Sequence, residues 1–404
     1  MLDVKKIKSD FPILSKQRNN KPFIYFDNAA TTQKPQLVID SICDFYSNYN
    51  SNIQRGMYFF ADKATMAFEK SREIVSSFLH TKFKEEIIFT SGTTQSINMV
   101  AFGFLKNTVS RGDEILIGEM EHHANIVPWQ VIALKLGVKF TKIKCCENGK
   151  IDISELEKKL NPKVKLIAVQ HVSNITGHEN NIKEICSLAH EKNITVFVDG
   201  AQAVSHKIIN VNDLGCDFYA FSGHKCFGPT GVGVLFGKKD LLLKMDPFIF
   251  GGNMIDQVSF SKSSWGNLPH KFEAGTANIA GVIGLGVAIQ YILSLGLVEI
   301  KKREKMLTEK MWESLNSINN IIIKNPQAPD TPIFSFNING VHGYDIGSLL
   351  DELNICVRTG HLCAQPAIES LGVSGLVRAS LCFYNTEEEV EIFESSIKKI
   401  TELL

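Results

Sequence analysis

Short apolar runs rich in β-branched and aromatic residues alternate with helix-length segments over the first half of the chain. The runs are residues 23–26, 86–89, 114–117, 164–169, 194–198 and 217–221. Strands separated in this way are typical of βαβ units, in which a mostly parallel sheet is buried on both faces. The pattern therefore predicts an α/β domain.

Polar side chains gather where these predicted strands end. They are Asp27 and Asn28, Ser91 to Thr94, His122 and His123, Asn174, Asp199, and Ser222 to Lys225. In sheets of this kind, ligands bind beyond the carboxyl ends of the strands. The six strand ends therefore predict one polar site along a single edge of the sheet.

A second set of elements begins beyond about residue 285. The pattern predicts a strand at 332–338, a helix near 344–353, and strands at 355–358 and 377–381. Thr386 and Glu389 form a capping-box pattern that opens an amphipathic helix to the C-terminus. We therefore expect an N-terminal segment (1–25) packing with a small C-terminal domain (286–404), and a large domain (26–285) between them.

One apolar run, residues 279–300, is long enough to be weighed as a membrane span. It contains four glycines together with Gln290 and Glu299, it is not repeated, and no basic flank precedes it. Glycines also suit close helix packing inside a large core. We therefore expect a buried helix.

Charge and cysteine usage narrow the class of protein. The 43 basic and 43 acidic residues balance without blocks, which indicates neither a nucleic-acid nor a membrane partner. The nine cysteines include no Cys-x-x-Cys, so a reducing compartment fits better than a disulfide framework or a zinc site. The first residues lack an apolar leader. This predicts a cytoplasmic protein, with an organellar stroma left open for a processed form.

Asp199 and Lys225 each stand directly after a predicted buried strand. A carboxylate there is costly to desolvate without a cationic partner, although a helix N-cap is an alternative role for Asp199. A lysine that forms a Schiff base and a carboxylate that holds a pyridinium nitrogen are the two anchors of pyridoxal 5'-phosphate (PLP). Ser91 to Thr94 open a helical pattern whose N–H groups and hydroxyls suit the phosphate.

Seven stretches resemble the cysteine desulfurases of the class-V aminotransferase family, most closely the SufS-type (group II) branch. They are Phe-Asp-Asn-Ala-Ala-Thr (26–31), Met-Glu-His-His-Ala-Asn-Ile-Val-Pro-Trp (120–129), His-Val-Ser-Asn (171–174), Val-Asp-Gly-Ala-Gln-Ala-Val (198–204), Ser-Gly-His-Lys (222–225), Phe-Glu-Ala-Gly-Thr (272–276) and Arg-Thr-Gly-His-Leu-Cys-Ala-Gln-Pro (358–366). The resemblance covers nearly the whole chain. It implies the PLP-dependent transferase fold type I, as in aspartate aminotransferase: a large domain with a mostly parallel seven-stranded sheet and a smaller C-terminal α/β domain.

The resemblance also implies a role for each matching residue. Lys225 would hold PLP and move the α-proton of the substrate, while His122, also catalytic, would stack on the ring and shuttle protons. The other cofactor contacts would be Asp199, Gln202, Thr93, Thr94, Ser222, His224 and Thr276, the last from the second subunit of a homodimer. The substrate L-cysteine would contact Arg378, Asn174, Asn28, Ala29 and Arg358.

Cys363 is the candidate sulfur-accepting residue, because its loop lies between two arginines that favour a thiolate. The resemblance implies a persulfide on Cys363, release of alanine, and delivery of the sulfur to iron–sulfur cluster assembly. The loop is short in this branch, so a SufE-like or SufU-like carrier must come to it. His342 matches a position that contacts the zinc of SufU-type partners, and residues 258–271 match a hairpin that reaches over the neighbouring subunit.

Other functions stay open at this point. Selenocysteine lyase and cysteine-sulfinate desulfinase share the scaffold, and Cys363 is required for sulfur but not for selenium. A non-enzymatic metal or sulfur carrier would use His122, His123, Cys145 and Cys146, and it would leave Lys225 and Asp199 without purpose.

Two positions depart from the family pattern. Tyr58 stands where histidine is usual, and Gln95 stands where glutamate is common. We expect both to affect partner handling or loop dynamics rather than cofactor anchoring.

Overall fold

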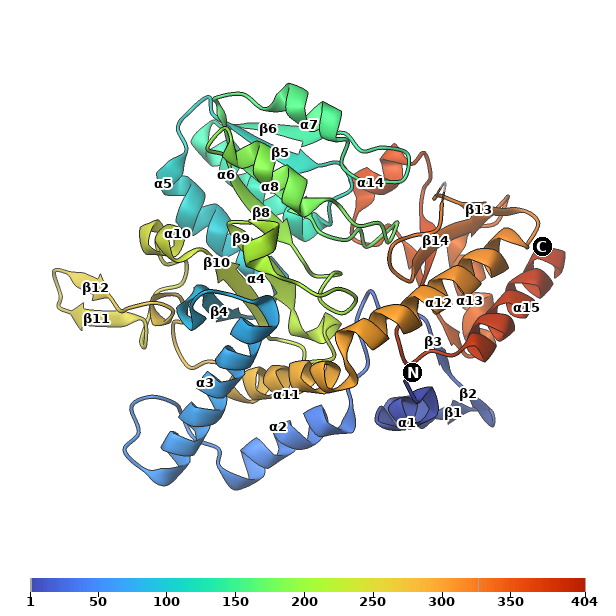
Figure 1. The fold of residues 1–404 in the computed structure, drawn as a ribbon, viewed down its shortest axis with the longest axis horizontal. Coiled ribbons are helices and arrows are strands. Elements are labelled where there is room, and N and C mark those ends of the chain that lie inside the picture. Colours follow the sequence, from blue (N-terminus) through green and yellow to red (C-terminus); the bar gives the residue numbers. More distant parts are fainter. Residues whose placement is uncertain (1, 326, 404) are drawn as a thin grey trace.

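The computed structural model describes residues 2–325 and 327–403 and contains a seven-stranded and a four-stranded sheet (Figure 1). The larger sheet consists of β4 (Ile87–Thr90), β5 (Glu114–Gly118), β6 (Lys139–Ile143), β7 (Val164–Gln170), β8 (Thr195–Asp199), β9 (Phe218–Ser222) and β10 (Gly233–Gly237). Their order is β4-β10-β9-β8-β7-β5-β6. Among these seven strands, β10 alone runs in the opposite direction to the rest. The predicted mostly parallel sheet is therefore confirmed.

Both faces of this sheet are covered, because alternate residues of its strands enter two separate cores. In β8, Val196 and Val198 join one core, whereas Phe197 joins the other. The helices on the two faces are α2 (Gln36–Asn48), α3 (Phe59–Leu79), α8 (Ile182–His190) and α11 (Ile279–Leu295) in the first core, and α4 (Thr93–Val100), α6 (Val127–Leu136) and α10 (Lys239–Lys244) in the second. Such double burial explains the near-continuous apolar runs of the central strands.

One predicted strand is placed differently. Residues 23–26 form β3 (Ile24–Tyr25), which pairs in parallel with β15 (Ile355–Cys356) and takes no part in the large sheet. Both Ile24 and Phe26 pack in the core of the smaller sheet. A short apolar run does not encode which sheet it joins, so its partner comes from the far end of the chain.

The smaller sheet has the order β13-β14-β17-β16. Its strands and covering helices are β13 (Ile321–Ile323), β14 (Ile333–Ile338), β16 (Arg358–Gly360), β17 (Leu376–Ser380), α12 (Leu297–Asn316), α13 (Gly343–Glu352) and α15 (Glu387–Leu403). The predicted capping box opens α15: Glu389 N–H donates to Thr386 Oγ1 over 3.2 Å, and Thr386 N–H donates to the Glu389 carboxylate over 3.0 Å. The predicted boundaries at residues 25 and 285 stay predictions.

Most of the glycine-rich run forms α11, which is buried along most of its length and ends at Leu295 with Gly296 as its C-cap; residues 297–300 begin α12. A Cβ at Gly286 would lie 2.5 Å from Ser71 Oγ on α3, so glycine permits this close approach. The predicted buried helix is confirmed. Within the described residues no single helix meets the length and hydropathy of a membrane span; α11 and α12 together do, but they are bent by 77°.

The remaining elements lie at the periphery. They are α1 (Val4–Ser9), β1 (Gln17–Arg18), β2 (Lys21–Pro22), α5 (Lys106–Thr108), α7 (Ile153–Lys159), α9 (Val211–Leu214), β11 (Ile255–Val258), β12 (Ser263–Trp265) and α14 (Gln365–Ser370). The β11–β12 hairpin projects from the body of the molecule, at the left of Figure 1.

Candidate active site

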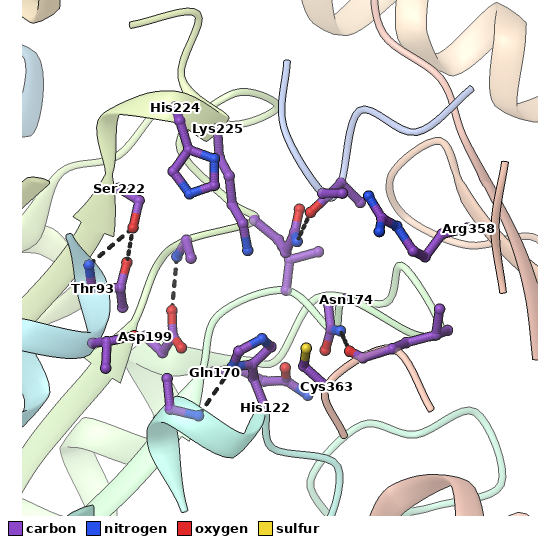
Figure 2. A pocket seen from close by; sticks show the side chains of 18 of the residues that line it. Thr93, His122, Gln170, Asn174, Asp199, Ser222, His224, Lys225, Arg358 and Cys363 are labelled. Atoms are coloured by element: carbon purple, nitrogen blue, oxygen red, sulfur yellow. Dashed lines mark hydrogen bonds between the residues drawn. The ribbon is translucent and has the colours of Figure 1, made fainter. Parts of the chain in front are cut away.

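A cavity of about 300 Å³ opens at the carboxyl ends of the central strands, and Arg358 and Arg378 of the smaller sheet complete its lining. The predicted residues that line it are Ala29, Thr93, Thr94, His122, Asn174, Asp199, Gln202, Ser222, His224, Lys225, Arg358, Cys363 and Arg378. Figure 2 shows Lys225, Asp199 and His122 converging on one space, with Cys363 at its edge. The structure therefore brings together most of the predicted site.

Asp199 and Lys225 form an enclosed pair of opposite charge. Asp199 is the last residue of β8, it is buried, and its Oδ1 accepts a hydrogen bond of 2.9 Å from Ala201 N–H. Burial raises the pKa of Asp199, and the Lys225 charge opposes that rise. Burial lowers the pKa of Lys225, with Asp199 opposing. An amine with a lowered pKa is more readily available as a nucleophile.

Hydroxyl groups and a helix N-terminus form a cradle for an anion. Ser222, at the end of β9, accepts a 2.9 Å hydrogen bond from Thr93 N–H and lies 2.8 Å from Thr93 Oγ1. A Cβ at Gly233 would lie 2.4 Å from the Cα of Gly92, so only glycine lets β10 pass so close to this loop. Thr93 opens α4, where N–H groups and the helix dipole favour a phosphate.

Two histidines of the cavity stay neutral. The Nδ1 atom of His122 accepts a hydrogen bond from Ala124 N–H over 3.0 Å, which leaves the proton on Nε2. Burial, followed by the charges of Lys225, His123 and Arg378, lowers the pKa of His122 to about 3. Burial and the charges of Lys225 and Lys34 lower the pKa of His224 to about 4. A neutral imidazole at position 122 suits stacking on an aromatic ring.

Two predicted site residues lie outside the cavity lining. The Asn28 amide donates to Ser380 O over 2.8 Å, and its oxygen accepts from the hydroxyl of Tyr384. Asn28 therefore supports the backbone beside Ala29. Thr276 is exposed in a loop of this chain. Their assigned contacts with substrate and cofactor stay predictions.

Arg358 and Arg378 are paired directly across β16 and β17. Asp27 lies between them, 2.5 Å from Arg358 Nη2 and 3.5 Å from Arg378 Nη2. Arg358 is exposed, whereas Arg378 is buried, and burial lowers the pKa of Arg378 to about 10. The Nε atom of Arg378 has no hydrogen-bond partner, and neither has Oδ1 of Asn174. These buried, unpartnered atoms indicate a polar ligand.

Cys363 is exposed on a loop that the rest of the site holds in place. Both Leu362 (φ 53°) and Cys363 (φ 56°) adopt left-handed backbone conformations, which non-glycine residues rarely do. Asn174 Nδ2 donates to Leu362 O over 2.9 Å, and His123 N–H donates to Cys363 O over 2.7 Å. Strained backbone of this kind is often found at functional sites.

Several lining residues were not predicted from sequence: Ala30, Ala124, Gln170, Val172, Ala201 and Leu362. Gln170 is the informative omission, because its Nε2 donates to Met120 O over 2.6 Å and supports the segment that carries His122. It ends β7, so the rule that polar residues follow strands could have identified it. The small apolar residues carry no such signal.

Of the carrier ligands considered from sequence, His122 lines the cavity. His123, Cys145 and Cys146 do not, and neither do the family departures Tyr58 and Gln95. The Gln95 side chain accepts a 2.5 Å hydrogen bond from Ser91 N–H, and Tyr58 Oη lies 2.7 Å from Ser51 Oγ on the surface. Burial raises the pKa of Cys145 to about 12. Over residues 2–325 and 327–403, no three His, Cys, Asp or Glu side chains are grouped to hold a metal ion.

The geometry fits PLP. The Thr93–Ser222 cradle suits a phosphate, Asp199 lies where a ring nitrogen needs a carboxylate, and Lys225 supplies an enclosed amine. The unpartnered atoms of Arg378 and Asn174 lie on another part of the wall, where an amino acid carrying a carboxylate would fit.

Comparison with known proteins gives concordant matches. The family model described as aminotransferase class-V matches residues 24–393. A probable cysteine desulfurase of Halalkalibacterium halodurans is 44% identical over 99% of this chain and 98% of its own. The apo structure of a cysteine desulfurase from Thermococcus onnurineus has a TM-score of 0.95 and 37% identity, covering 100% and 99% of the two chains. The cysteine desulfurase CsdA of Escherichia coli has a TM-score of 0.93 and 35% identity, covering 100% of both.

Proposed function

Because the chain belongs to the aminotransferase class-V family, as one of its cysteine desulfurases, we propose that it transfers the sulfur of L-cysteine to Cys363 and releases L-alanine. Its cofactor is PLP. One observation carries the proposal: Lys225 and Cys363 line the same cavity as Arg378 and Asn174, each of which has one buried polar atom (Nε and Oδ1) without a protein partner.

The residues that would hold the cofactor follow from their chemistry. Lys225 provides the covalent anchor, Asp199 the counter-charge for the ring nitrogen, and the Thr93–Ser222 cradle the hydrogen bonds to the phosphate. His122 and Ala201 line the cavity and provide surfaces for the ring. When bound, PLP supplies the electron sink that the α-carbon of an amino acid requires for these bond changes.

The substrate would be oriented by Arg358 and Arg378, which together form one wall of the cavity and are called the arginine wall below. The planar guanidinium of Arg378 is suited to a carboxylate, and its Nε is available for one. Asn174 has its amide nitrogen committed to Leu362, so its oxygen is left to accept an N–H or S–H group of the substrate. In this arrangement the sulfur of the bound cysteine would face Cys363.

Two side chains would then do the chemistry. Lys225 Nζ takes the α-proton of the substrate and can return it. The Cys363 thiolate attacks the substrate sulfur, so an S–S bond forms while the C–S bond breaks and leaves its electron pair on Cβ. Protonation of that carbon yields alanine, and the persulfide remains on Cys363.

The test compares three forms of the holoenzyme: wild type, Cys363→Ala, and Cys43→Ala as a control at another exposed cysteine. Wild type and Cys43→Ala should release alanine from L-cysteine and gain one sulfur atom on the Cys363 peptide by mass spectrometry. Cys363→Ala should do neither. Full alanine release by Cys363→Ala would contradict the proposal.

The substrate range has its own discriminating measurement. Selenocysteine lyase activity is expected to survive in Cys363→Ala, whereas cysteine desulfuration is not. Comparing L-cysteine, L-selenocysteine and L-cysteine sulfinate with both forms ranks the three activities. The non-enzymatic carrier predicts a colourless protein that yields no alanine, because it needs no aldehyde cofactor.

We further propose that the chain is a SufS-type desulfurase of the cytoplasm and that it acts as a homodimer. The projecting hairpin exposes Val258, Phe260 and Trp265, and such apolar groups outside the core are typical of a protein interface. Exposed Thr276 would then reach the cavity of the second subunit. Light scattering that gave a monomer mass for the holoenzyme would contradict this.

The acceptor would be a SufE-like or SufU-like carrier that feeds iron–sulfur cluster assembly. The held loop supports this. Cys363 is exposed, but its own carbonyl accepts a hydrogen bond from His123 and the carbonyl of Leu362 accepts one from Asn174, so the partner must approach the loop. His342 is exposed and caps α13, stacked on Tyr344. Adding each carrier separately should raise the rate of alanine release for the true partner, and His342→Ala should weaken only a SufU-like one.

A further inference from the structure

We propose that Lys34 is a positioning residue for Lys225: its ammonium group fixes the carbonyl oxygen of His224 and so aims the amine of Lys225 into the cavity. This inference rests on the proposed function, in which Lys225 is the covalent anchor of PLP. Lys34 does not line the cavity and acts only through the loop that carries Lys225.

Four donors converge on the oxygen of His224, the peptide unit that leads directly into Lys225. Lys34 Nζ lies 3.0 Å away, Thr31 Oγ1 3.0 Å, Thr32 Oγ1 3.1 Å and Thr32 N–H 3.0 Å. A carbonyl oxygen has two lone pairs, so this oxygen receives more donors than a peptide group ordinarily satisfies. Such convergence marks a point that the fold holds firmly.

The other bonds of the loop complete the clamp. Phe227 N–H donates to Thr32 Oγ1 over 2.8 Å, although Phe227 has a left-handed φ of 59°. On the opposite side, Gly223 N–H donates to Val232 O over 2.8 Å. The loop around Lys225 is therefore held between residues 31–34 and β10, and the aim of Lys225 depends on both attachments.

Lys34 is the charged member of the clamp, and its partners are neutral. Besides His224 O, its Nζ contacts Thr31 Oγ1 at 3.4 Å and the carbonyl of Thr32. Across the described ranges, no carboxylate lies within ion-pair distance of it. Burial lowers the pKa of Lys34 to about 8, opposed by the nearby Cys226 thiol. Burying an ammonium group without a counter-ion carries a desolvation penalty. A neutral side chain would fill a purely structural role without that penalty.

The charge has a direct structural use. Hydrogen bonds from a charged donor are shorter and roughly twice as strong as neutral ones. Lys34 therefore holds the 224–225 peptide more tightly than the two threonines can alone. Because Schiff-base formation needs the amine of Lys225 at the aldehyde carbon, a small error in its direction slows that step.

The experiment separates aiming from folding by using two cofactor forms. PLP forms a Schiff base with Lys225, whereas pyridoxamine phosphate offers the same ring and phosphate without an aldehyde. Both are added to the full-length protein freed of cofactor, as wild type, Lys34→Met, Lys34→Arg, and Lys16→Met as a control at an exposed lysine. Fluorescence gives the affinity for pyridoxamine phosphate, and absorbance gives the rate of Schiff-base formation with PLP.

We expect Lys34→Met to slow Schiff-base formation about ten- to a hundredfold. Its affinity for pyridoxamine phosphate and its melting temperature should stay close to those of the wild type. Lys34→Arg, which keeps a charged donor, should recover most of the rate, and Lys16→Met should behave as wild type. Thr31→Val, which removes a neutral donor, should slow the same step to a smaller extent.

Three outcomes would overturn the inference. The first is a wild-type rate of Schiff-base formation in Lys34→Met. The second is a loss of pyridoxamine phosphate affinity in Lys34→Met as large as its loss of rate, which would show that Lys34 contributes to phosphate binding or to folding. The third applies if Lys34→Met fails to fold: the test then rests on Thr31→Val, and an unchanged rate of Schiff-base formation in that variant overturns the inference. Failure of the wild type itself to form a Schiff base, while it still binds pyridoxamine phosphate, would refute the role of Lys225 instead.

Discussion

The backbone N–H of His123 donates a hydrogen bond of 2.7 Å to the carbonyl oxygen of Cys363. The His123 ring accepts a second one, of 2.8 Å, from Gln365 N–H. His123, which follows β5 of the large sheet, thus holds the cysteine loop at Cys363 itself and two residues beyond it. Burial and His361 lower the pKa of His123, so its ring is a neutral acceptor at neutral pH.

Replacing His123 by alanine should loosen this loop. Removing the acceptor of Gln365 N–H is expected to speed hydrogen exchange in residues 361–368 by about fivefold, because the bond contributes about 1 kcal/mol. The kcat for L-cysteine should fall, while KM stays within about twofold, since the arginine wall is intact. Exchange mass spectrometry and steady-state kinetics measure both. His361→Ala, on the same exposed loop, is the control; equal exchange in the two variants would contradict the assignment.

Exchanging either arginine for lysine should have very different consequences. Arg378→Lys should raise KM for L-cysteine about ten- to a hundredfold, because the planar fork and the free Nε are lost from a buried wall. Arg358→Lys should change KM by less than about threefold, because Arg358 is exposed and its ammonium substitute still reaches Asp27. Steady-state kinetics of the two variants decide. Similar KM values for the two variants would show that binding of the substrate carboxylate does not depend on Arg378.

The buried pair Arg72–Glu273 should be a major contributor to stability. Both side chains are buried; they form hydrogen bonds of 2.8 and 2.9 Å, and Glu273 also accepts from Phe89 N–H over 2.8 Å. Glu273→Gln removes the buried counter-charge of Arg72 and leaves it only the more exposed Glu69, which should lower the free energy of unfolding by about 3 kcal/mol, the low end for breaking a buried pair. Urea unfolding measures it.

An exposed ion pair provides the matched control. Asp213→Asn breaks the surface pair Lys183–Asp213, and it should cost less than about 1 kcal/mol. The double variant Arg72→Met with Glu273→Met should recover part of the loss, because no charge is then left buried. Equal costs for Glu273→Gln and Asp213→Asn would refute the distinction.

Glu179 should make the protein sensitive to acid. Burial raises its pKa, but hydrogen bonds from His171 and Lys207 and their charges outweigh this and lower the pKa to about 2 from 4.5. A carboxyl whose folded pKa is lowered stabilises the fold above its unfolded pKa, and that contribution is lost as the pH falls from about 4.5 towards 2.

Glu179→Gln should therefore flatten the pH dependence of the melting temperature in this range while lowering it at pH 7. Thermal unfolding followed from pH 7 downward measures the slope. Glu157→Gln, at an exposed position of α7, should leave the slope unchanged. An identical acid slope in wild type and Glu179→Gln would exclude Glu179 as a source of acid sensitivity.

The sequence predicted the parallel core of the large sheet because double burial makes its strands continuously apolar. It did not reveal β6, an edge strand whose residues are mostly half-exposed or exposed, or β10, a short strand that begins and ends with glycine. The strand at 23–26 was assigned to the wrong sheet, since β3 finds its partner more than three hundred residues later.

For the site, residue types identified Lys225, Asp199 and Cys363, whose chemistry is specific. Contacts that depend on the order of strands in the sheets could not be predicted from the sequence. The Thr93–Ser222 bond exists because β10 places β4 and β9 on either side of itself. Asp27 separates two arginines only because β3 joins the small part of the molecule. Asn28, beside it in sequence, points to Ser380 and Tyr384 instead of the cavity.

The pairing of β3 with β15 has a consequence for the order of biosynthesis. A ribosome releases Asp27 more than three hundred residues before Arg358 and Arg378. Domains generally fold as units, N-terminal first, while translation continues. The half of the pocket with Lys225 can thus fold first. The nascent chain acquires the substrate-facing wall only after Arg358 and Arg378 have been synthesised. A premature stop between α11 and Arg378 would consequently leave a protein that can recruit the vitamin but not grip an amino acid.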